Sequence, residues 1–108
     1  MPPNLHELKV WPEYFVTVQT RPFEVRKNDR DFKLADHLVL KEWDPKKKES
    51  TGRQVERLVT HIFDGTEYLG DDGGAVIRAG YVILGVSPVP FGQSMLLDER
   101  PSHVKEAA

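Results

Sequence analysis

The chain of 108 residues contains no cysteine. This absence excludes disulfides and thiolate chemistry, and it makes a reducing cytoplasm the expected location. Long hydrophobic runs are also absent, because the longest apolar stretch, near residues 81–84, is far too short to span a bilayer. The first residues do not contain a basic segment followed by an apolar one, so we expect neither a signal peptide nor attachment to a membrane.

Sequence motifs of the common cofactor and metal sites are missing. The Gly-Lys-Ser/Thr of a Walker loop does not occur, and Gly70, Gly73 and Gly74 do not form a dinucleotide-binding fingerprint. The four histidines lack the spacing of zinc ligands, and Asp71-Asp72 lacks the periodic oxygen ligands of a calcium loop. A nucleophile elbow is absent as well. The sequence therefore predicts no cofactor and no bound metal ion.

The charge is small and unevenly distributed along the chain. A formal net charge of −2 excludes a strongly basic protein that attracts nucleic acid over its whole surface. Residues 1–60 carry 12 Lys/Arg and 10 Asp/Glu, whereas residues 61–108 carry 3 and 7. Any basic surface is therefore expected to come from the first half of the chain.

Hydrophobic periodicity predicts one helix and five strands. Four apolar residues from Trp11 to Val18 follow the i, i+3, i+4, i+7 spacing of an amphipathic helix. We expect this helix near residues 12–20, because Pro22 ends it. The expected strands are residues 6–10, 22–27, 37–43, 53–63 and the buried stretch 81–84.

Short strands separated by turn signals favour a small barrel. The alternation breaks near Arg57-Leu58, which indicates a bulge or a strand that switches partners, and residues 64–79 are expected to form a long loop. We expect an α+β, mainly β fold: a small mixed β-barrel of five or six strands with one N-terminal helix covering it. Residues 1–87 would form this domain, and residues 88–108, interrupted by prolines, an irregular tail. The residues predicted to be largely buried are Tyr14, Phe15, Val18, Phe23, Val25, Leu38, Leu40, Val82 and Leu84.

The charged run of residues 21–30 is the most informative stretch. In an extended strand, alternate side chains point to opposite faces. Phe23 and Val25 are therefore expected to face the core, and Glu24 and Arg26 to lie together on the other face. A carboxylate beside a guanidinium on a rigid strand suits recognition of a nucleobase or a phosphate. The alternative is a solvated ion-pair ladder, which contributes little.

Four segments carry a pattern of specific residues: His6-x-Leu8-Lys9, Glu24-x-Arg26-Lys27-Asn28-Asp29-Arg30, Leu34-Ala35-Asp36-x-Leu38-x-Leu40-x-Glu42-Trp43 and Thr51-Gly52-Arg53. In order and spacing they resemble a small branch of the ASCH/PUA-like superfamily that has itself been labelled a domain of unknown function. The resemblance covers about residues 6–86, and the second segment is its specific part. It implies a PUA/ASCH-like β-barrel whose cleft, beside the first helix, binds RNA, a nucleotide or a modified nucleoside.

The superfamily signature, Gly-x-Lys-x-x-Glu-x-Arg, is kept in part. Glu24 and Arg26 match it, whereas Gln19 replaces the glycine and Arg21 replaces the lysine. Loss of the glycine removes an easy left-handed helix cap. Arginine keeps the positive charge of lysine but does not deprotonate near neutral pH.

One branch of the superfamily hydrolyses acetylated cytidine with a lysine, a threonine and a glutamate. Its lysine aligns with Arg21 and its threonine nucleophile aligns with Glu24, so the resemblance disfavours that amidohydrolase mechanism here. A different hydrolysis stays open, with Glu24 as general base on a water, and Thr60 could enter the cleft from another strand.

The sequence leads to an RNA- or nucleotide-binding module with a cleft lined by Glu24 and Arg26. One alternative is a small hydrolase acting on a modified nucleoside, and a second is a protein-interaction domain without a small ligand. No catalytic residue is predicted, and enzymatic activity and oligomeric state stay open. The expected ligand-binding residues are Lys9, Arg21, Glu24, Arg26, Asn28 and Arg30.

Overall fold

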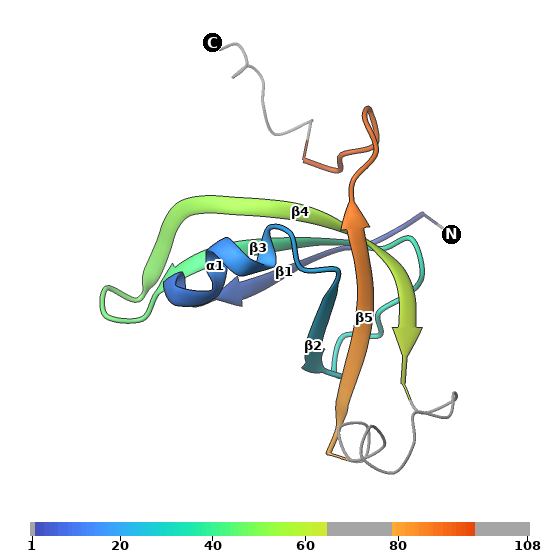
Figure 1. Ribbon diagram of the computed structural model, residues 1–108, viewed down its shortest axis with the longest axis horizontal. Helices are drawn as coiled ribbons and strands as arrows, with labels where there is room; N and C mark the ends of the chain where they lie inside the picture. The colour runs from blue at the N-terminus through green and yellow to red at the C-terminus, as the bar shows by residue number, and fades with distance from the viewer. Residues whose placement is uncertain (1, 65–78, 97–108) are drawn as a thin grey trace.

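The computed structural model describes residues 2–64 and 79–96, and within them one short helix and five strands. The elements are β1 (Leu5–Val10), α1 (Pro12–Val18), β2 (Phe23–Lys27), β3 (His37–Asp44), β4 (Glu49–Phe63) and β5 (Tyr81–Pro88). The strands form one sheet in the order β1-β3-β4-β5-β2, in which β1 is parallel to β3 and the other neighbouring pairs are antiparallel. The prediction of a mainly β fold with one N-terminal helix is therefore confirmed (Figure 1).

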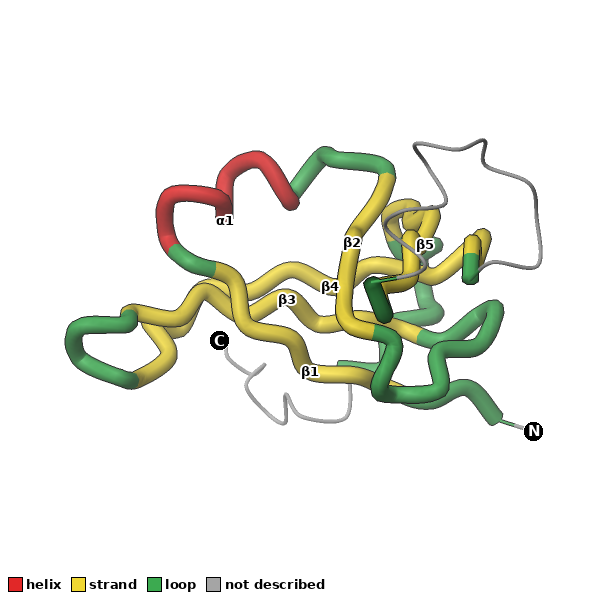
Figure 2. The backbone as a smooth tube through the Cα atoms, turned by 90° about the horizontal axis from the view of Figure 1, so that it is seen from below, coloured by secondary structure: helices red, strands yellow, loops and turns green. Residues whose placement is uncertain are grey.

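The long strand β4 belongs to both halves of the sheet. Its first part pairs with β3 as far as Leu58, and its last part pairs with β5 from Arg57 onward. A register shift between Val59 and His61 follows the change of partner. The predicted break near Arg57-Leu58 is therefore confirmed. Because β4 bends as it passes from β3 to β5, the sheet curls into a half-barrel (Figures 1 and 2).

The edge strands of the curled sheet are β1 and β2. Two arginines from the β2 side reach the backbone of β1. Arg26 Nη1 donates to the carbonyl oxygen of Lys9 at 3.2 Å, and Arg30 Nη1 donates to the carbonyl oxygen of Glu7 at 2.8 Å. In the described part of the chain, side chains and not a strand ladder connect the two edges of the half-barrel.

The helix α1 lies over the part of the sheet that contains β3 (Figure 2). The helix begins at Pro12, a position whose N–H would have no partner within the helix, so proline costs no hydrogen bond there. Glu13 in the first turn interacts favourably with the positive end of the helix dipole. Phe15 and Val18 are buried against the sheet. The helix ends at Val18, two residues before the end predicted for it.

The core is a single apolar cluster between α1 and the inner face of the sheet. Six residues predicted to be buried belong to it, which confirms that part of the prediction, whereas Tyr14, Phe23 and Val25 are exposed. Tyr14 lies at the margin of the helical stripe and faces a pocket described below. The buried cluster consists of Leu8, Val10, Phe15, Val18, Phe32, Leu38, Leu40, Val59, Val82, Leu84 and Val86.

The predicted orientation of β2 is wrong. Phe23 and Val25 point outward, whereas the side chain of Glu24 is only 1% exposed. The cause lies on β4, whose Arg57 brings a buried positive charge to the same side of the sheet as Glu24. A buried charge is costly without an opposite charge nearby, so the polar face of β2 turns inward.

The expected C-terminal tail lies only partly within the described residues. Residues 89–96 contain turns and no helix or strand, and the loop predicted over 64–79 falls almost wholly outside the described residues. Within the described part of the chain, no helix is long and apolar enough to cross a membrane.

Candidate functional site

A pocket of about 280 Å³ opens between α1 and β2. The end of β1, the exposed side of α1, the connection after the helix and the inner face of β2 each contribute to its wall. Six of its nine lining residues are charged or aromatic, so the pocket is polar with an aromatic rim. The lining residues are Lys9, Val10, Trp11, Tyr14, Val18, Arg21, Glu24, Val25 and Arg26.

The carboxylate of Glu24 lies between two guanidinium groups. Arg21 Nη2 donates to Oε2 at 3.1 Å, and Arg26 donates to Oε1 through Nε at 3.3 Å and through Nη2 at 3.2 Å. Both carboxylate oxygens therefore accept hydrogen bonds from within the protein. Because the two arginines cover Glu24, its main effect is to hold their guanidinium groups in place.

Each of these arginines is also held by the backbone. Arg21 Nε donates to the carbonyl oxygen of Phe23 at 3.0 Å, and Arg26 Nη1 donates to that of Lys9 at 3.2 Å. Their side chains still remain 29% and 24% exposed. Two oriented guanidinium groups therefore reach the surface of the pocket with their positions fixed from behind.

A third arginine, Arg57, supports the site from inside the protein. It is 5% exposed, and it donates over long distances of 3.4 Å to the carbonyl oxygens of Gln19 and Arg21. Its buried Nε has no hydrogen-bond partner among the described residues. Burial lowers the pKa of Arg57, and the negative charge of Glu24 opposes this shift. A guanidinium stays protonated in proteins, so Arg57 adds a buried positive charge beside Glu24.

The rim of the pocket combines a lysine with aromatic side chains. Trp11 and Tyr14 are both exposed where α1 borders the pocket. Lys9 lines the pocket at the end of β1, where its carbonyl oxygen accepts from Arg26, and its Nζ lies 3.9 Å from the ring centroid of Trp43, outside the lining, in a cation–π contact. The rim therefore offers flat apolar faces next to positive charge.

Four of the six predicted ligand-binding residues line this pocket: Lys9, Arg21, Glu24 and Arg26. The other two do not. Asn28 is exposed in the turn after β2, where its N–H donates to the carbonyl oxygen of Gly80. Arg30 lines a separate hollow of about 190 Å³ next to Arg26 and bridges to β1.

Three residues at the site, Trp11, Tyr14 and Arg57, are not among the ligand-binding residues predicted from the sequence. Trp11 and Tyr14 belong to the apolar stripe that predicts the helix, and Tyr14 was expected to be buried, but a helix of about two turns has room for only a narrow buried face. Arg57 gave one signal: a charged residue at the point where the alternation of β4 breaks. Thr60 is exposed and does not line the pocket.

Three other carboxylates lie away from the pocket; Asp36 and Glu42 are buried, and Glu56 is half-buried. Burial raises the pKa of Asp36. Hydrogen bonds from the N–H of Asn4, from His6 and from the N–H of Lys33 lower the pKa by more than burial raises it, so it lies below its usual value. Arg53 and Thr51 lower the pKa of Glu42 to about 2.

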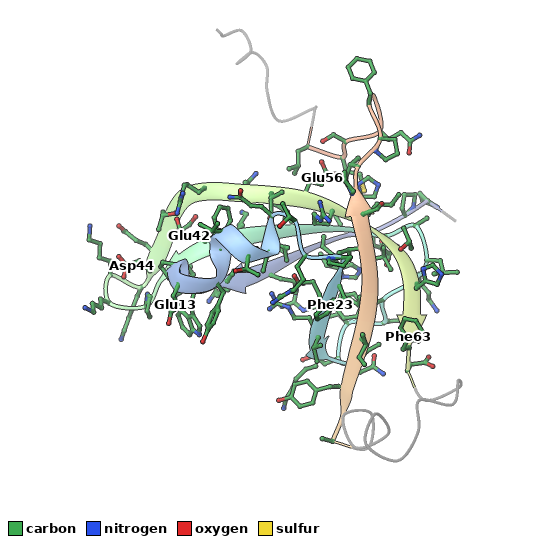
Figure 3. The ribbon with its side chains drawn as sticks, in the orientation of Figure 1. Glu13, Phe23, Glu42, Asp44, Glu56 and Phe63 are labelled. Carbon is green, nitrogen blue, oxygen red and sulfur yellow. The ribbon has the colours of Figure 1, made fainter. Side chains whose placement is uncertain are left out.

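Glu56 forms the third of these clusters. Burial raises its pKa, but hydrogen bonds from the Ser94 hydroxyl, the N–H of Met95 and His37 outweigh burial and lower it. The distance from His37 Nδ1 to Oε2 is 2.6 Å. Glu42 lies on the arm of the sheet that carries α1. Glu56 is a residue of β4 and lies beside the C-terminal end of β5 (Figure 3). Among the described residues, no cluster of His, Asp and Glu is arranged to hold a metal ion.

Comparison with known proteins places the chain in a family. One relative, from Escherichia phage P2, is described as an uncharacterized 12.9 kDa protein in the GpA 3′ region and is 36% identical over 70 residues. The match covers 63% of this chain and 62% of the phage protein, so the chain spans less than two thirds of that relative's length. The family model described as "Domain of unknown function (DUF3850)" matches residues 5–86, from β1 into β5. The chain therefore belongs to the DUF3850 family.

Proposed function

We propose that this protein is an RNA- or nucleotide-binding module whose ligand lies in the pocket lined by Glu24 and Arg26. One observation carries the proposal: two oriented guanidinium groups meet exposed aromatic side chains at a single pocket. Arginine suits phosphates and base edges because its planar fork donates two parallel hydrogen bonds. Aromatic faces add stacking with bases of any sequence.

The assignment to the ASCH/PUA-like superfamily is part of this proposal. In its support, the half-barrel has its pocket beside the first helix, where the superfamily is expected to bind its ligand. The residues at the signature positions, Arg21, Glu24 and Arg26, also form one hydrogen-bonded group. A sequence signature whose residues meet at a pocket favours binding over a purely structural role.

Hydrolysis of a modified nucleoside receives less support from the pocket. No serine or threonine is among the described residues that line it. Both oxygens of Glu24 accept hydrogen bonds from arginines, so the carboxylate is poorly placed to take a proton from a water. We therefore expect purified protein not to release cytidine from acetylated cytidine, and sustained release would make the hydrolase the leading function.

Titration with a labelled single-stranded RNA and with nucleotides tests the proposal. We expect binding at low salt that weakens with added salt, by about 0.7 in log K per log salt for each contacted phosphate. Arg26→Gln removes one charge-assisted contact and should weaken binding by about tenfold or more. Lys46→Gln removes one exposed charge in the turn between β3 and β4 and should leave the affinity almost unchanged.

Two outcomes would reject the proposal. One is the absence of binding to RNA and to nucleotides at low salt, which would favour the protein-interaction alternative. The other is an equal loss of affinity in the Arg26 and Lys46 variants, because this would indicate general charge attraction without a defined pocket. A thermal unfolding curve of each variant confirms that the fold is intact.

A further inference from the structure

We infer that the pocket recognises a terminal phosphate monoester, as carried by a free nucleotide or by the phosphorylated end of an RNA. It would not primarily recognise the internal phosphodiesters of a strand. This inference rests on the proposed function and specifies which chemical group of the ligand meets the two arginines.

The two arginines at the pocket keep N–H donors that the protein itself does not use. A guanidinium has five N–H groups. Arg21 uses two of them and Arg26 uses three within the protein, which leaves three and two for a ligand. Glu24 is 1% exposed, so the ligand meets guanidinium groups and not the carboxylate. An arrangement of fixed donors without an accessible acceptor suits an oxyanion.

The charge at the pocket also favours a phosphate monoester over a phosphodiester. Around Glu24, the guanidinium groups of Arg21, Arg26 and the buried Arg57 carry three positive charges against one negative charge, so this group has a net charge of +2. A phosphate monoester carries about −1.5 to −2 near pH 7, whereas each internal phosphodiester carries about −1. The monoester therefore balances the charge of this group better than a phosphodiester does.

The size of the pocket and the residues around it favour a single nucleotide over a long strand. A pocket of about 280 Å³ is at the lower end of ligand sites and suits one nucleotide. The three consecutive lysines 46–48 lie in the turn between β3 and β4, at the far end of the arm from β2 (Figures 1 and 2). Arg30 is held by the backbone of Glu7. A long strand leaving the pocket would therefore be far from these lysines and would meet positive charge only in the neighbouring hollow of Lys27 and Arg30, which also contains Asp29.

Calorimetric titration compares a nucleoside, its 5′-monophosphate and inorganic phosphate. We expect the monophosphate to bind about tenfold or more tightly than the nucleoside, because it gains charge-assisted hydrogen bonds. Inorganic phosphate should bind more weakly than the monophosphate, because it lacks the base that stacks on the rim. The monophosphate should also bind more tightly at about pH 7.5 than at about pH 5, because its second proton leaves near pH 6.

Two protein variants and two RNA oligonucleotides test whether the preference for a terminal phosphate arises at this pocket. Arg21→Gln should remove most of the preference for the monophosphate over the nucleoside, and Lys46→Gln should keep that preference. An RNA of about ten nucleotides with a 5′-phosphate should bind more tightly than the same RNA without it. If the free monophosphate binds more tightly than this RNA end, the source is the free nucleotide, and the reverse order identifies the RNA end.

Different results would reject the preference for a terminal phosphate and the binding of nucleotides. Equal affinity for nucleoside and monophosphate, or for RNA with and without the 5′-phosphate, would overturn the inference and leave nucleotide binding in place. Inorganic phosphate binding as tightly as the monophosphate would also overturn it, since the base would then contribute nothing. No binding of any of these probes at low salt would overturn both.

Discussion

Two buried glutamates, Glu24 on β2 and Glu42 on β3, both lie against arginine, and they do so in different ways. Glu42 accepts from a single arginine at short distances, 2.8 Å to Nε and 2.7 Å to Nη2 of Arg53, and from the Thr51 hydroxyl at 2.6 Å. Glu24 accepts from two arginines at 3.1–3.3 Å and has Arg57 behind it.

The difference lies in the charge balance. One carboxylate and one guanidinium make the Glu42 pair neutral, and Arg53 is 59% exposed to water. Around Glu24, three guanidinium groups meet one carboxylate, and one of them is buried. A neutral pair stabilises a hairpin, whereas a surplus of oriented positive charge next to a pocket attracts an anion.

The helix α1 contacts both regions, and its two faces should respond differently to mutation. The ring of Phe15 is buried, with the guanidinium of Arg53 5.0 Å from its centroid, so Phe15→Ala should lower the free energy of unfolding by about 3–5 kcal/mol. Tyr14→Ala should change it by only about 0.5 kcal/mol, because Tyr14 is exposed. Urea denaturation measures both values, and similar losses would contradict the packing of α1.

Neutralising each glutamate tests the charge balance. Glu24→Gln should lower the free energy of unfolding by about 3 kcal/mol, because it leaves the buried charge of Arg57 without a counter-charge. Glu42→Gln should lower it less, because the exposed Arg53 remains hydrated after its partner is removed. The same denaturation series measures the pair. A larger loss for Glu42→Gln would mean that the shorter hydrogen bonds, and not the buried cation, decide stability.

The aromatic rim should matter for binding more than for stability. Tyr14→Ala should weaken nucleotide binding by about 1–3 kcal/mol if the base stacks on this ring. Tyr14→Phe is the matched control and should bind like the unmodified protein, because it keeps the aromatic face. If Tyr14→Ala binds as tightly as Tyr14→Phe, the base does not lie on α1, and only the arginine side of the pocket is used.

Acid should weaken the fold through the carboxylates outside the pocket. The pKa of Glu42 falls from its ordinary 4.5 to about 2 in the folded protein, so its contribution to stability is present above pH 4.5 and is lost as the pH falls towards 2. The pKa values of Asp36 and Glu56 are also lowered, so they contribute in the same direction. Thermal unfolding between pH 4.5 and pH 2 should show a smaller fall in Tm for Glu42→Gln than for the unmodified protein. An unchanged pH dependence would contradict the assignment of this pair.

The sequence determined the elements of this protein. The apolar spacing of residues 11–18 predicted the helix, and Pro22 predicted the return to an extended chain. The break in alternation at Arg57-Leu58 predicted the point where β4 changes partner. These predictions succeeded because helix periodicity, proline and strand alternation act within a few residues of the chain. The charged run also pointed to residues that line the pocket, because Arg21, Glu24 and Arg26 meet there.

Only the tertiary structure decided which face of β2 points inward. Alternation divides Phe23 and Val25 from Glu24 and Arg26, but it is symmetrical and does not tell inside from outside. The choice depends on Arg57, which lies more than thirty residues later and brings a buried charge to the inner face. Long-range electrostatics therefore turned Glu24 inward and placed its arginines at a pocket. No local pattern in the sequence contains that information, because Arg57 lies on β4, which is distant from β2 along the chain and separated from it in the sheet by β5.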